Sequence, residues 1–217
     1  MSILKVAASI LAGDFRNLER EVKAVQKAGA DWIHLDVMDG HFVDNLTFGP
    51  VIVEAVNQIT DLPLDVHLMI ANPDKYIERY IQAGADYLTV HIEACPEVAK
   101  TLECIRSNGA KAGLTLKPAT AIEKILPYFK QIDLLLVMTV NPGFAGQVFM
   151  PEVLPKLKQA REYIDRKNLK VELEVDGGIN PQTAVEVRMN GVTVLVAASA
   201  IFGHKDYAEA IRNLRGK

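Results

Sequence analysis

The amino-acid sequence predicts an α/β fold, a single-domain (β/α)8 TIM barrel over residues 1–217. Short apolar runs alternate with amphipathic stretches along the chain, a pattern typical of parallel strands connected by helices. Glycines recur where an amphipathic stretch ends and an apolar run begins, at Gly29, Gly84, Gly109 and Gly191. Their spacing corresponds to roughly 27 residues per unit, so the chain holds eight units, the number that closes a TIM barrel.

The expected strands are apolar on both faces, as in Leu134-Leu-Leu-Val-Met138, because helices cover the outside of such a barrel and packed side chains fill its inside. We expect strands near residues 4–9, 31–37, 64–69, 86–92, 111–116, 133–140, 170–176 and 192–197.

Several expected helices begin with proline, which is favoured at the first helical position, as at Pro73, Pro151 and Pro181. A doubly wound open sheet would show the same alternation, and the count of eight units favours the closed barrel. We expect helices near residues 15–28, 50–59, 73–83, 96–107, 120–129, 151–167, 181–189 and 205–215.

Composition argues against several classes of partner. The net charge is −3 with both signs interspersed, so no basic surface for nucleic acid is evident and no nucleic-acid partner is expected. No apolar run is long enough to cross a membrane, and no membrane partner is expected. The apolar run at 6–12 is short and is followed by Asp14, so it predicts a strand rather than a signal peptide. Cys95 and Cys104 are too few for a disulfide framework, which indicates a cytoplasmic protein.

Four residues at the ends of expected strands predict a metal site. His34 and Asp36 are two apart on one strand and therefore share a face, and His67 and Asp176 lie just before turns on two other strands. The carboxyl ends of barrel strands surround one mouth, so the four side chains should meet there. Two imidazoles and two carboxylates suit one divalent ion such as Zn, Fe, Mn or Co.

Each of these residues also has a simpler interpretation. A single strand histidine such as His34 can be an ordinary core residue, but a buried carboxylate such as Asp36 without a partner is costly. His91 also ends a strand and could join the ligands, or could lie behind them or in solvent beside Glu93. Asp65 shares the face of His67 and could support a ligand from below.

Other residues nearby give weaker signals. Asp39 is interpreted as a turn former beside Gly40, and His41 and His204 carry little signal.

Methionines and glycine-rich turns should surround the same mouth. Met38, Met69 and Met138 end three strands; they could pack in the core or form a polarizable wall over a developing anion. The turns at 141–147, 176–179 and 197–200 contain small residues that let backbone N–H groups approach an anion, which favours phosphate as the ligand.

Together these segments resemble the ribulose-phosphate 3-epimerase family nearly from end to end. The stretches that carry the resemblance are Ala8-Ser-Ile-Leu11, His34-Leu-Asp-Val-Met-Asp-Gly-His-Phe-Val43, Asn45-Leu-Thr-Phe-Gly-Pro50, Asp65-Val-His-Leu-Met69, Met138-Thr-Val-Asn-Pro-Gly-Phe144 and Glu174-Val-Asp-Gly-Gly-Ile-Asn180.

The resemblance implies metal-dependent epimerisation at C3 that interconverts D-ribulose 5-phosphate and D-xylulose 5-phosphate in the pentose phosphate pathway. Asp36 and Asp176 would exchange the proton through an enediolate stabilised by the metal. A homo-oligomer is also expected, because barrels of this size often associate. The residues expected to bind the ketose phosphate are Ser9, Met38, His67, Met69, Met138, Gly143, Phe144, Ala145, Gly146, Asp176, Gly177, Gly178, Ala198 and Ser199.

The sequence departs from the family at two places. Ala145 replaces a glycine of the usual Gly-Phe-Gly-Gly, and Ala198 replaces the glycine of Gly-Ser, so easy access to positive φ is lost at both positions. Phe-Ala-Gly-Gln also occurs in the related D-allulose-6-phosphate 3-epimerases, which leaves a six-carbon substrate as an alternative.

Two more distant alternatives remain. One is a phosphate-binding barrel lyase or decarboxylase, which would use an Asp-x-Lys-x-x-Asp run; here Met38 occupies the place of that lysine. The other is a non-catalytic sugar-phosphate binding protein, which would need no metal.

Overall fold

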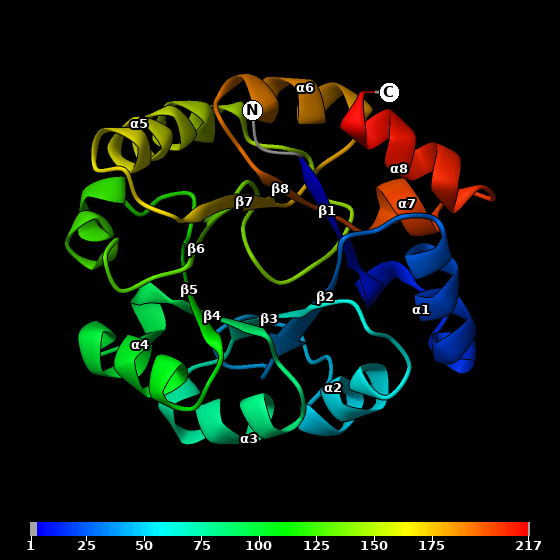
Figure 1. The fold of residues 1–217 in the computed structure, drawn as a ribbon, viewed down its shortest axis with the longest axis horizontal. Coiled ribbons are helices and arrows are strands. Elements are labelled where there is room, and N and C mark those ends of the chain that lie inside the picture. The colour runs from blue at the N-terminus through cyan, green and yellow to red at the C-terminus, as the bar shows by residue number, and fades with distance from the viewer. Residues whose placement is uncertain (1–3, 217) are drawn as a thin grey trace.

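The structure is a computed structural model that describes residues 4–216. Its described residues contain eight parallel strands that close into a barrel in the order β1 to β8, with β8 paired to β1 (Figure 1). The helices form a ring outside the strands. The predicted TIM barrel is confirmed, whereas a domain span of 1–217 stays a prediction. The strands are Lys5–Ser9, Trp32–Met38, Leu64–Met69, Tyr87–His91, Lys111–Leu116, Leu134–Met138, Glu172–Asp176 and Val194–Ala197.

The α-helices follow the strands and begin close to their predicted positions. The glycines that marked the units lie at the C-terminal ends of α1, α3, α4 and α6 and have positive φ, as expected of residues that terminate helices. The helices α1 to α8 are Leu18–Lys27, Pro50–Asn57, Ile77–Gln82, Val98–Ser107, Leu154–Arg166, Pro181–Met189, Ser199–Phe202 and Tyr207–Arg215.

Two parts of the helix prediction differ from the structure. Residues 120–129 form no α-helix but two short 3-10 turns, Ile122–Lys124 and Leu126–Tyr128. Pro127 explains this, because within an α-helix it would lack its hydrogen bond and clash with the carbonyl of Glu123. The extra helix α7, directly after β8, was not predicted because four residues show no helical period.

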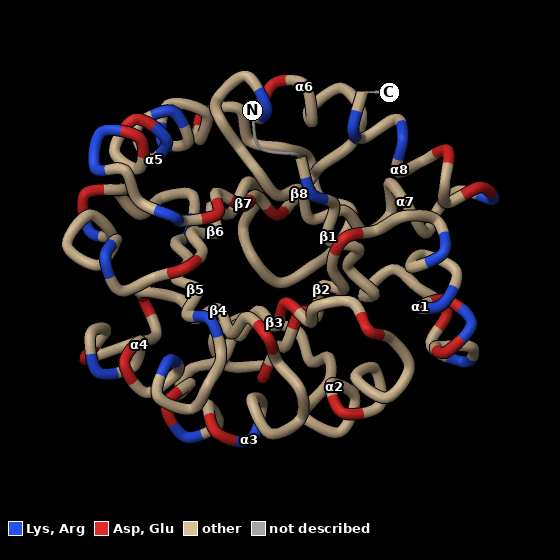
Figure 2. The backbone as a smooth tube through the Cα atoms, viewed as in Figure 1, with Lys and Arg blue, Asp and Glu red and all other residues tan. Residues whose placement is uncertain are grey.

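The hydrophobic core has layers that follow from strand alternation. Outward-facing strand residues such as Leu35, Val66 and Leu88 pack against the helices in the main cluster. Inward-facing residues, among them Trp32 and Leu136, form a second cluster inside the barrel. Polar side chains also face the inside of the barrel, from β1 to β5 and from β7, and Figure 2 shows acidic residues near the barrel centre as well as on the outer ring of helices. Most acidic residues on the outer helices face solvent, whereas most of those inside the barrel are buried, and buried charges need partners.

None of the helices in residues 4–216 combines the length and the apolar character needed to cross a lipid bilayer.

Candidate metal centre and active site

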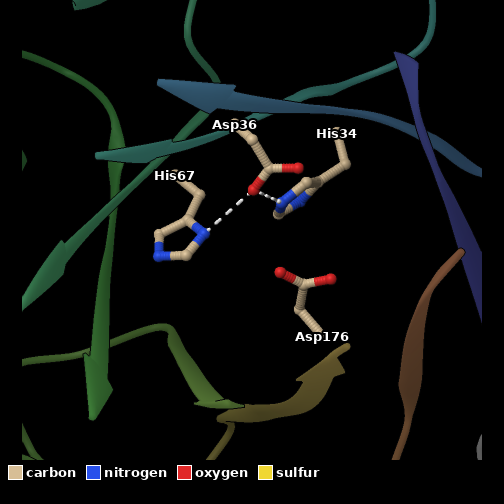
Figure 3. A group of neighbouring side chains, drawn as sticks. All are labelled: His34, Asp36, His67 and Asp176. Atoms are coloured by element: carbon tan, nitrogen blue, oxygen red, sulfur yellow. Dashed lines mark hydrogen bonds and ion pairs between the residues drawn. The ribbon is translucent and has the colours of Figure 1, made fainter. Parts of the chain in front are cut away.

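Strand register brings the four predicted metal ligands to one place. Asp36 of β2 pairs in register with His67 of β3, and His34 lies two residues before Asp36 on the same face. Asp176 ends β7, on the other side of the barrel mouth, and its carboxyl group points toward the other three side chains (Figure 3). Each of the four offers a ligand atom, and these atoms lie within 4.8 Å of one another.

The close distances centre on one carboxylate oxygen. Asp36 Oδ1 lies 3.1 Å from His34 Nε2 and 3.2 Å from His67 Nδ1, and both histidines are fully buried. Together with Asp176 these residues would be able to hold one divalent cation, because imidazole nitrogens and carboxylate oxygens are the ligands that such ions take in proteins. The other oxygen of this carboxylate, Oδ2, accepts a hydrogen bond of 2.9 Å from the Ser9 hydroxyl.

Electrostatics at this point favours positive charge. Burial lowers the pKa of His34, but the carboxylates of Asp36 and Asp65 outweigh it and hold that pKa well above its ordinary value. For His67, burial dominates and lowers the pKa. A site that raises the proton affinity of a fully buried imidazole also suits a cation, so the donor set and its charge fit a divalent metal.

The two carboxyl groups facing each other across the mouth differ in proton affinity. Burial raises the pKa of Asp36, but attraction to His34 and the contacts of both imidazoles with this carboxylate reverse this and bring it well below its ordinary value. Burial and repulsion from Asp36 raise the pKa of Asp176 to about 7. In the metal-free site at neutral pH, Asp36 therefore stays ionised, whereas Asp176 holds a proton part of the time.

Both imidazoles are held from behind. His34 Nδ1 lies 2.5 Å from Asp65 Oδ2, so Asp65 supports this ligand from below as the sequence suggested. His67 Nε2 lies 2.9 Å from His91 Nε2, and His91 Nδ1 lies 3.2 Å from Glu93 Oε2. His91 therefore stands behind His67 rather than among the ligands, and burial lowers its pKa to about 4.

Glu174 is a fully buried carboxyl group that the sequence analysis missed. With His34 and Asp65 it forms a second cluster of ligand atoms within 4.8 Å, below the first. Burial and the charge of Asp65 raise the pKa of Glu174 well above its ordinary value, which favours its neutral form. The signal was available, because Glu174 precedes Asp176 by two and so shares its face.

The cation position opens into a cavity of about 280 Å³. All the residues predicted to bind substrate line this cavity except His67, which is fully buried behind Asp36. The three methionines, Met38, Met69 and Met138, come together on its wall, although their proposed electronic role stays a prediction. Further lining residues that the sequence analysis did not single out are Leu11, Val140, Pro142, Gln147, Ile179, Asn180, Pro181, Val196, Ala200 and His204.

The small residues around the cavity differ in how strictly they are needed. Gly177 and Gly178 have φ of 115° and 65°, and a Cβ on Gly178 would lie 2.5 Å from the backbone nitrogen of Phe149. Ala198, by contrast, has φ of −107°, and Ala145 is not among the residues with positive φ. Neither departure from the usual glycines therefore places an alanine at positive φ.

Comparisons with known proteins agree along the whole chain. The profile of the Ribulose-phosphate 3 epimerase family matches residues 5–202. The ribulose-phosphate 3-epimerase of Bacillus subtilis is 53% identical over 215 residues, covering 99% of both chains. That of Synechocystis is 50% identical and covers 97% of this chain and 92% of its own.

Solved structures with lower identity share the fold alone. A 3-hexulose-6-phosphate synthase has a TM-score of 0.69 at 20% identity and covers 100% of this chain and 99% of its own. The tryptophan synthase α-subunit of Pyrococcus furiosus has a TM-score of 0.70 at 14% identity and covers 100% of both chains. The family profile and the two close relatives show that the chain belongs to the ribulose-phosphate 3-epimerase family.

Proposed function

We propose that this protein interconverts D-ribulose 5-phosphate and D-xylulose 5-phosphate in the pentose phosphate pathway, with one divalent cation held by His34, Asp36, His67 and Asp176. Two relatives that are at least half identical over nearly their full lengths carry the name of this activity. The observation that supports the chemistry most directly is the pair of carboxyl groups, Asp36 and Asp176, which face each other across the mouth with pKa values shifted in opposite directions.

The reaction removes a proton from C3, next to the C2 carbonyl, and returns one to the opposite face of the same carbon. Asp36 and Asp176 come from strands on opposite sides of the barrel, so each carboxyl can serve one face of a substrate lying between them. A divalent cation, when bound, supplies Lewis-acid stabilisation of the negative charge that develops on oxygen. The roles of the two carboxyls exchange with the direction of the reaction.

Ser9 and two methionines influence the orientation and the surroundings of the Asp36 carboxylate. The Ser9 hydroxyl holds one oxygen of Asp36, and both histidines lie against the other oxygen, so the carboxylate cannot rotate freely. Met38 and Met69 pack with Val43 beside it and exclude water from that side of the cavity. Less water around the carboxyls raises their affinity for a proton, which a metal-bound aspartate needs in order to act as a base.

The opposite wall of the cavity is the proposed phosphate position. It is formed by the turns after β6, β7 and β8, which contain Gly143, Gly146, Gly177, Gly178, Ala198 and Ser199. The crowding around Gly178 keeps this turn narrow, so backbone N–H groups can approach an anion without side chains between them. This is the usual place for phosphate in a TIM barrel.

Substrate and metal can be tested with the purified enzyme. We expect kcat/KM for D-ribulose 5-phosphate to exceed that for D-allulose 6-phosphate by at least about tenfold, because the cavity must accommodate one more carbon of the sugar. Removing metal with a chelator should abolish both activities, and adding back Zn, Fe, Mn or Co separately should identify the cation. A preference for the six-carbon substrate would contradict the substrate proposal, and full activity after verified metal removal would contradict the cation.

We also propose a location and an assembly state. Cys95 and Cys104 are both free, as expected of a cytoplasmic protein. Cell fractionation tests that location. A homo-oligomer stays a prediction, which light scattering on the purified protein tests.

A further inference from the structure

A chain of hydrogen-bonding groups leads from the cation position to Glu93, in the segment directly after β4. Asp36 Oδ1 lies 3.2 Å from His67 Nδ1, His67 Nε2 lies 2.9 Å from His91 Nε2, and His91 Nδ1 lies 3.2 Å from Glu93 Oε2. Both imidazoles are fully buried. His34 differs, because its Nδ1 directly contacts a carboxylate, that of Asp65.

Counting protons along this chain gives it a direction. Three close contacts join two carboxylates through two imidazoles, and each contact needs one proton to become a hydrogen bond. Two neutral imidazoles carry one proton each, so one contact is left without a proton. A metal ligand must present a bare nitrogen, so the contact without a proton should be the one at His67 Nδ1.

Glu93 is the group that can fix this direction. Its Oε1 accepts hydrogen bonds from the backbone N–H of Lys117 at 2.9 Å and the hydroxyl of Thr120 at 2.5 Å. Burial raises the pKa of Glu93, but the hydrogen bonds from His91, Thr120 and Lys117 bring it down to about 2. An ionised Glu93 only accepts hydrogen bonds, so His91 must place its proton on Nδ1 and leave Nε2 bare. His67 then donates from Nε2.

We infer that His91 and Glu93 are positioning residues that fix the tautomer of His67, so that the lone pair of its Nδ1 faces the cation. The inference rests on the proposed cation site. On the other side of the site, the Asp65 carboxylate contacts the ligand His34 directly. Here the Glu93 carboxylate acts on the ligand His67 through one further imidazole, that of His91. Such groups behind a ligand set its orientation and basicity, and losing one weakens metal binding by about 10- to 100-fold.

A purely structural role for these residues makes a different prediction. The ring of Phe42 stacks on His91 with centroids 4.6 Å apart, and Lys117 Nζ lies 4.1 Å from the centroid of Phe42. Glu93 also ties the segment after β4 to the segment after β5. If packing and this tie were the whole role, glutamine should replace Glu93 at little cost to metal binding.

The Glu93→Gln variant separates the two roles. Its amide oxygen has to stay with the N–H of Lys117 and the hydroxyl of Thr120, because both are donors. The amide NH₂ group then faces His91 Nδ1 and donates to it, which drives the His91 proton to Nε2 and the His67 proton to Nδ1. We expect Zn²⁺ affinity, measured by competition with a chromophoric chelator, to fall by about 10- to 100-fold.

Two comparison variants sharpen this measurement. Thr120→Val removes a hydrogen bond from the other oxygen of Glu93 and should bind Zn²⁺ within about twofold of wild type. His91→Gln lets an amide oxygen accept from His67 whatever residue stands at 93, so adding Glu93→Gln to it should change affinity by less than about twofold. The inference would be overturned if Glu93→Gln bound Zn²⁺ as tightly as wild type. It would also be overturned if adding Glu93→Gln to His91→Gln lowered Zn²⁺ affinity as much as it does in the wild-type background.

The tautomers can also be read directly in the wild-type protein. Nitrogen-15 NMR of the histidine rings in the Zn²⁺-loaded protein should show the proton on Nδ1 of His91 and on Nε2 of His67, and this holds even if a variant does not fold. A His91 proton on Nε2 would overturn the inference while leaving the cation site standing. If His34→Ala bound Zn²⁺ as tightly as wild type, the cation site itself would be wrong and the inference would fall with it.

Discussion

The side-chain amide of Asn45 donates a hydrogen bond of 2.7 Å to the backbone carbonyl of Gly143. These residues belong to the segments after β2 and after β6, which come from different sides of the barrel. Gly143 begins the turn that carries Phe144 and lines the cavity, and Phe144 is 57% exposed. One side-chain hydrogen bond therefore ties a wall of the cavity to the strand that carries Asp36.

Removing this tie should weaken substrate binding more than it weakens the fold. In Asn45→Ala we expect KM for D-ribulose 5-phosphate to rise roughly twofold to tenfold, since a neutral hydrogen bond contributes about 0.5–1.5 kcal/mol. The melting temperature should change little, because Asn45 lies outside the hydrophobic core. Asn45→Asp keeps the shape but replaces the donor by an acceptor, so its KM should be at least as high. Wild-type KM in both variants would show that the tie does not matter for binding.

The two-carboxylate mechanism predicts an unusual phenotype for Asp176→Asn. The variant keeps the shape of the side chain but lacks one proton acceptor, so Asp36 can still deprotonate one epimer. That epimer should take up deuterium at C3 from D₂O without being converted, while the other epimer stays inert. Asp176 is the better position to change, because Asp36 also contacts Ser9 and both histidines.

Metal content must be measured first in Asp176→Asn, since lost metal could imitate a lost base. Asp44→Asn, which changes an exposed carboxyl group in the segment after β2, serves as the control and should keep wild-type turnover. If a metal-replete Asp176→Asn enzyme epimerised at the wild-type rate, the two-carboxylate mechanism would have to be abandoned.

Glycine should be required at position 178 but not at position 146. Both have positive φ, but a Cβ at 178 meets the backbone of Phe149 at 2.5 Å, whereas a Cβ at 146 meets nothing within 4 Å. Gly146→Ala should therefore cost only the backbone strain of about 1–2 kcal/mol. Gly178→Ala should also displace the proposed phosphate turn and raise KM by roughly tenfold or more, the loss of one hydrogen bond to a charged group. Thermal unfolding and steady-state kinetics of both variants check this, and equal KM values would count against a phosphate position at this turn.

Position 199 is less suitable than position 178 for testing the phosphate position. Ser199→Pro would delete a backbone donor at the first residue of α7, but Ala198 has ψ of −90°, which is disfavoured before proline. A higher KM in Ser199→Pro could therefore result from a displaced backbone as well as from the loss of the N–H donor. The pair at 178 and 146 is the cleaner test.

Stability of the cation-free protein should depend on pH through Asp176. Its pKa is about 7 in the folded protein and near 3.8 when unfolded, so between these values the folded state binds more protons. The free energy of unfolding should therefore fall as pH rises from about 4 to about 7, by up to roughly 1.4 kcal/mol per pH unit from this group. Glu174 acts in the same direction, because burial raises its pKa as well.

Comparing two proteins isolates the contribution of Asp176. Urea unfolding of metal-free wild type and Asp176→Asn across this pH range should give a shallower slope for the variant, since Glu174 is present in both. Identical slopes would show that the Asp176 carboxyl is not held in its neutral form.

The sequence by itself determined the repeated unit and the faces of the strands. The glycines at the ends of α1, α3, α4 and α6, the apolar strands and the spacing of two between His34 and Asp36 are local features. Local backbone geometry decides from them where a helix ends and which face of a strand a side chain takes. The four ligands could be found this way because they lie near the carboxyl ends of three strands, β2, β3 and β7. The prediction of a helix at 120–129 was wrong because Pro127 interrupts α-helical hydrogen bonding within this segment.

Tertiary structure decided which of these faces meet and what stands behind them. Nothing in the order of residues says that His91 lies behind His67, that Glu174 shares a cluster with Asp65, or that Asn45 reaches Gly143. Those contacts depend on strand register and on closure of the barrel between β1 and β8. Register and closure are fixed by the packing of the whole core, so only the folded chain sets the distances on which charge, hydrogen bonding and metal binding depend.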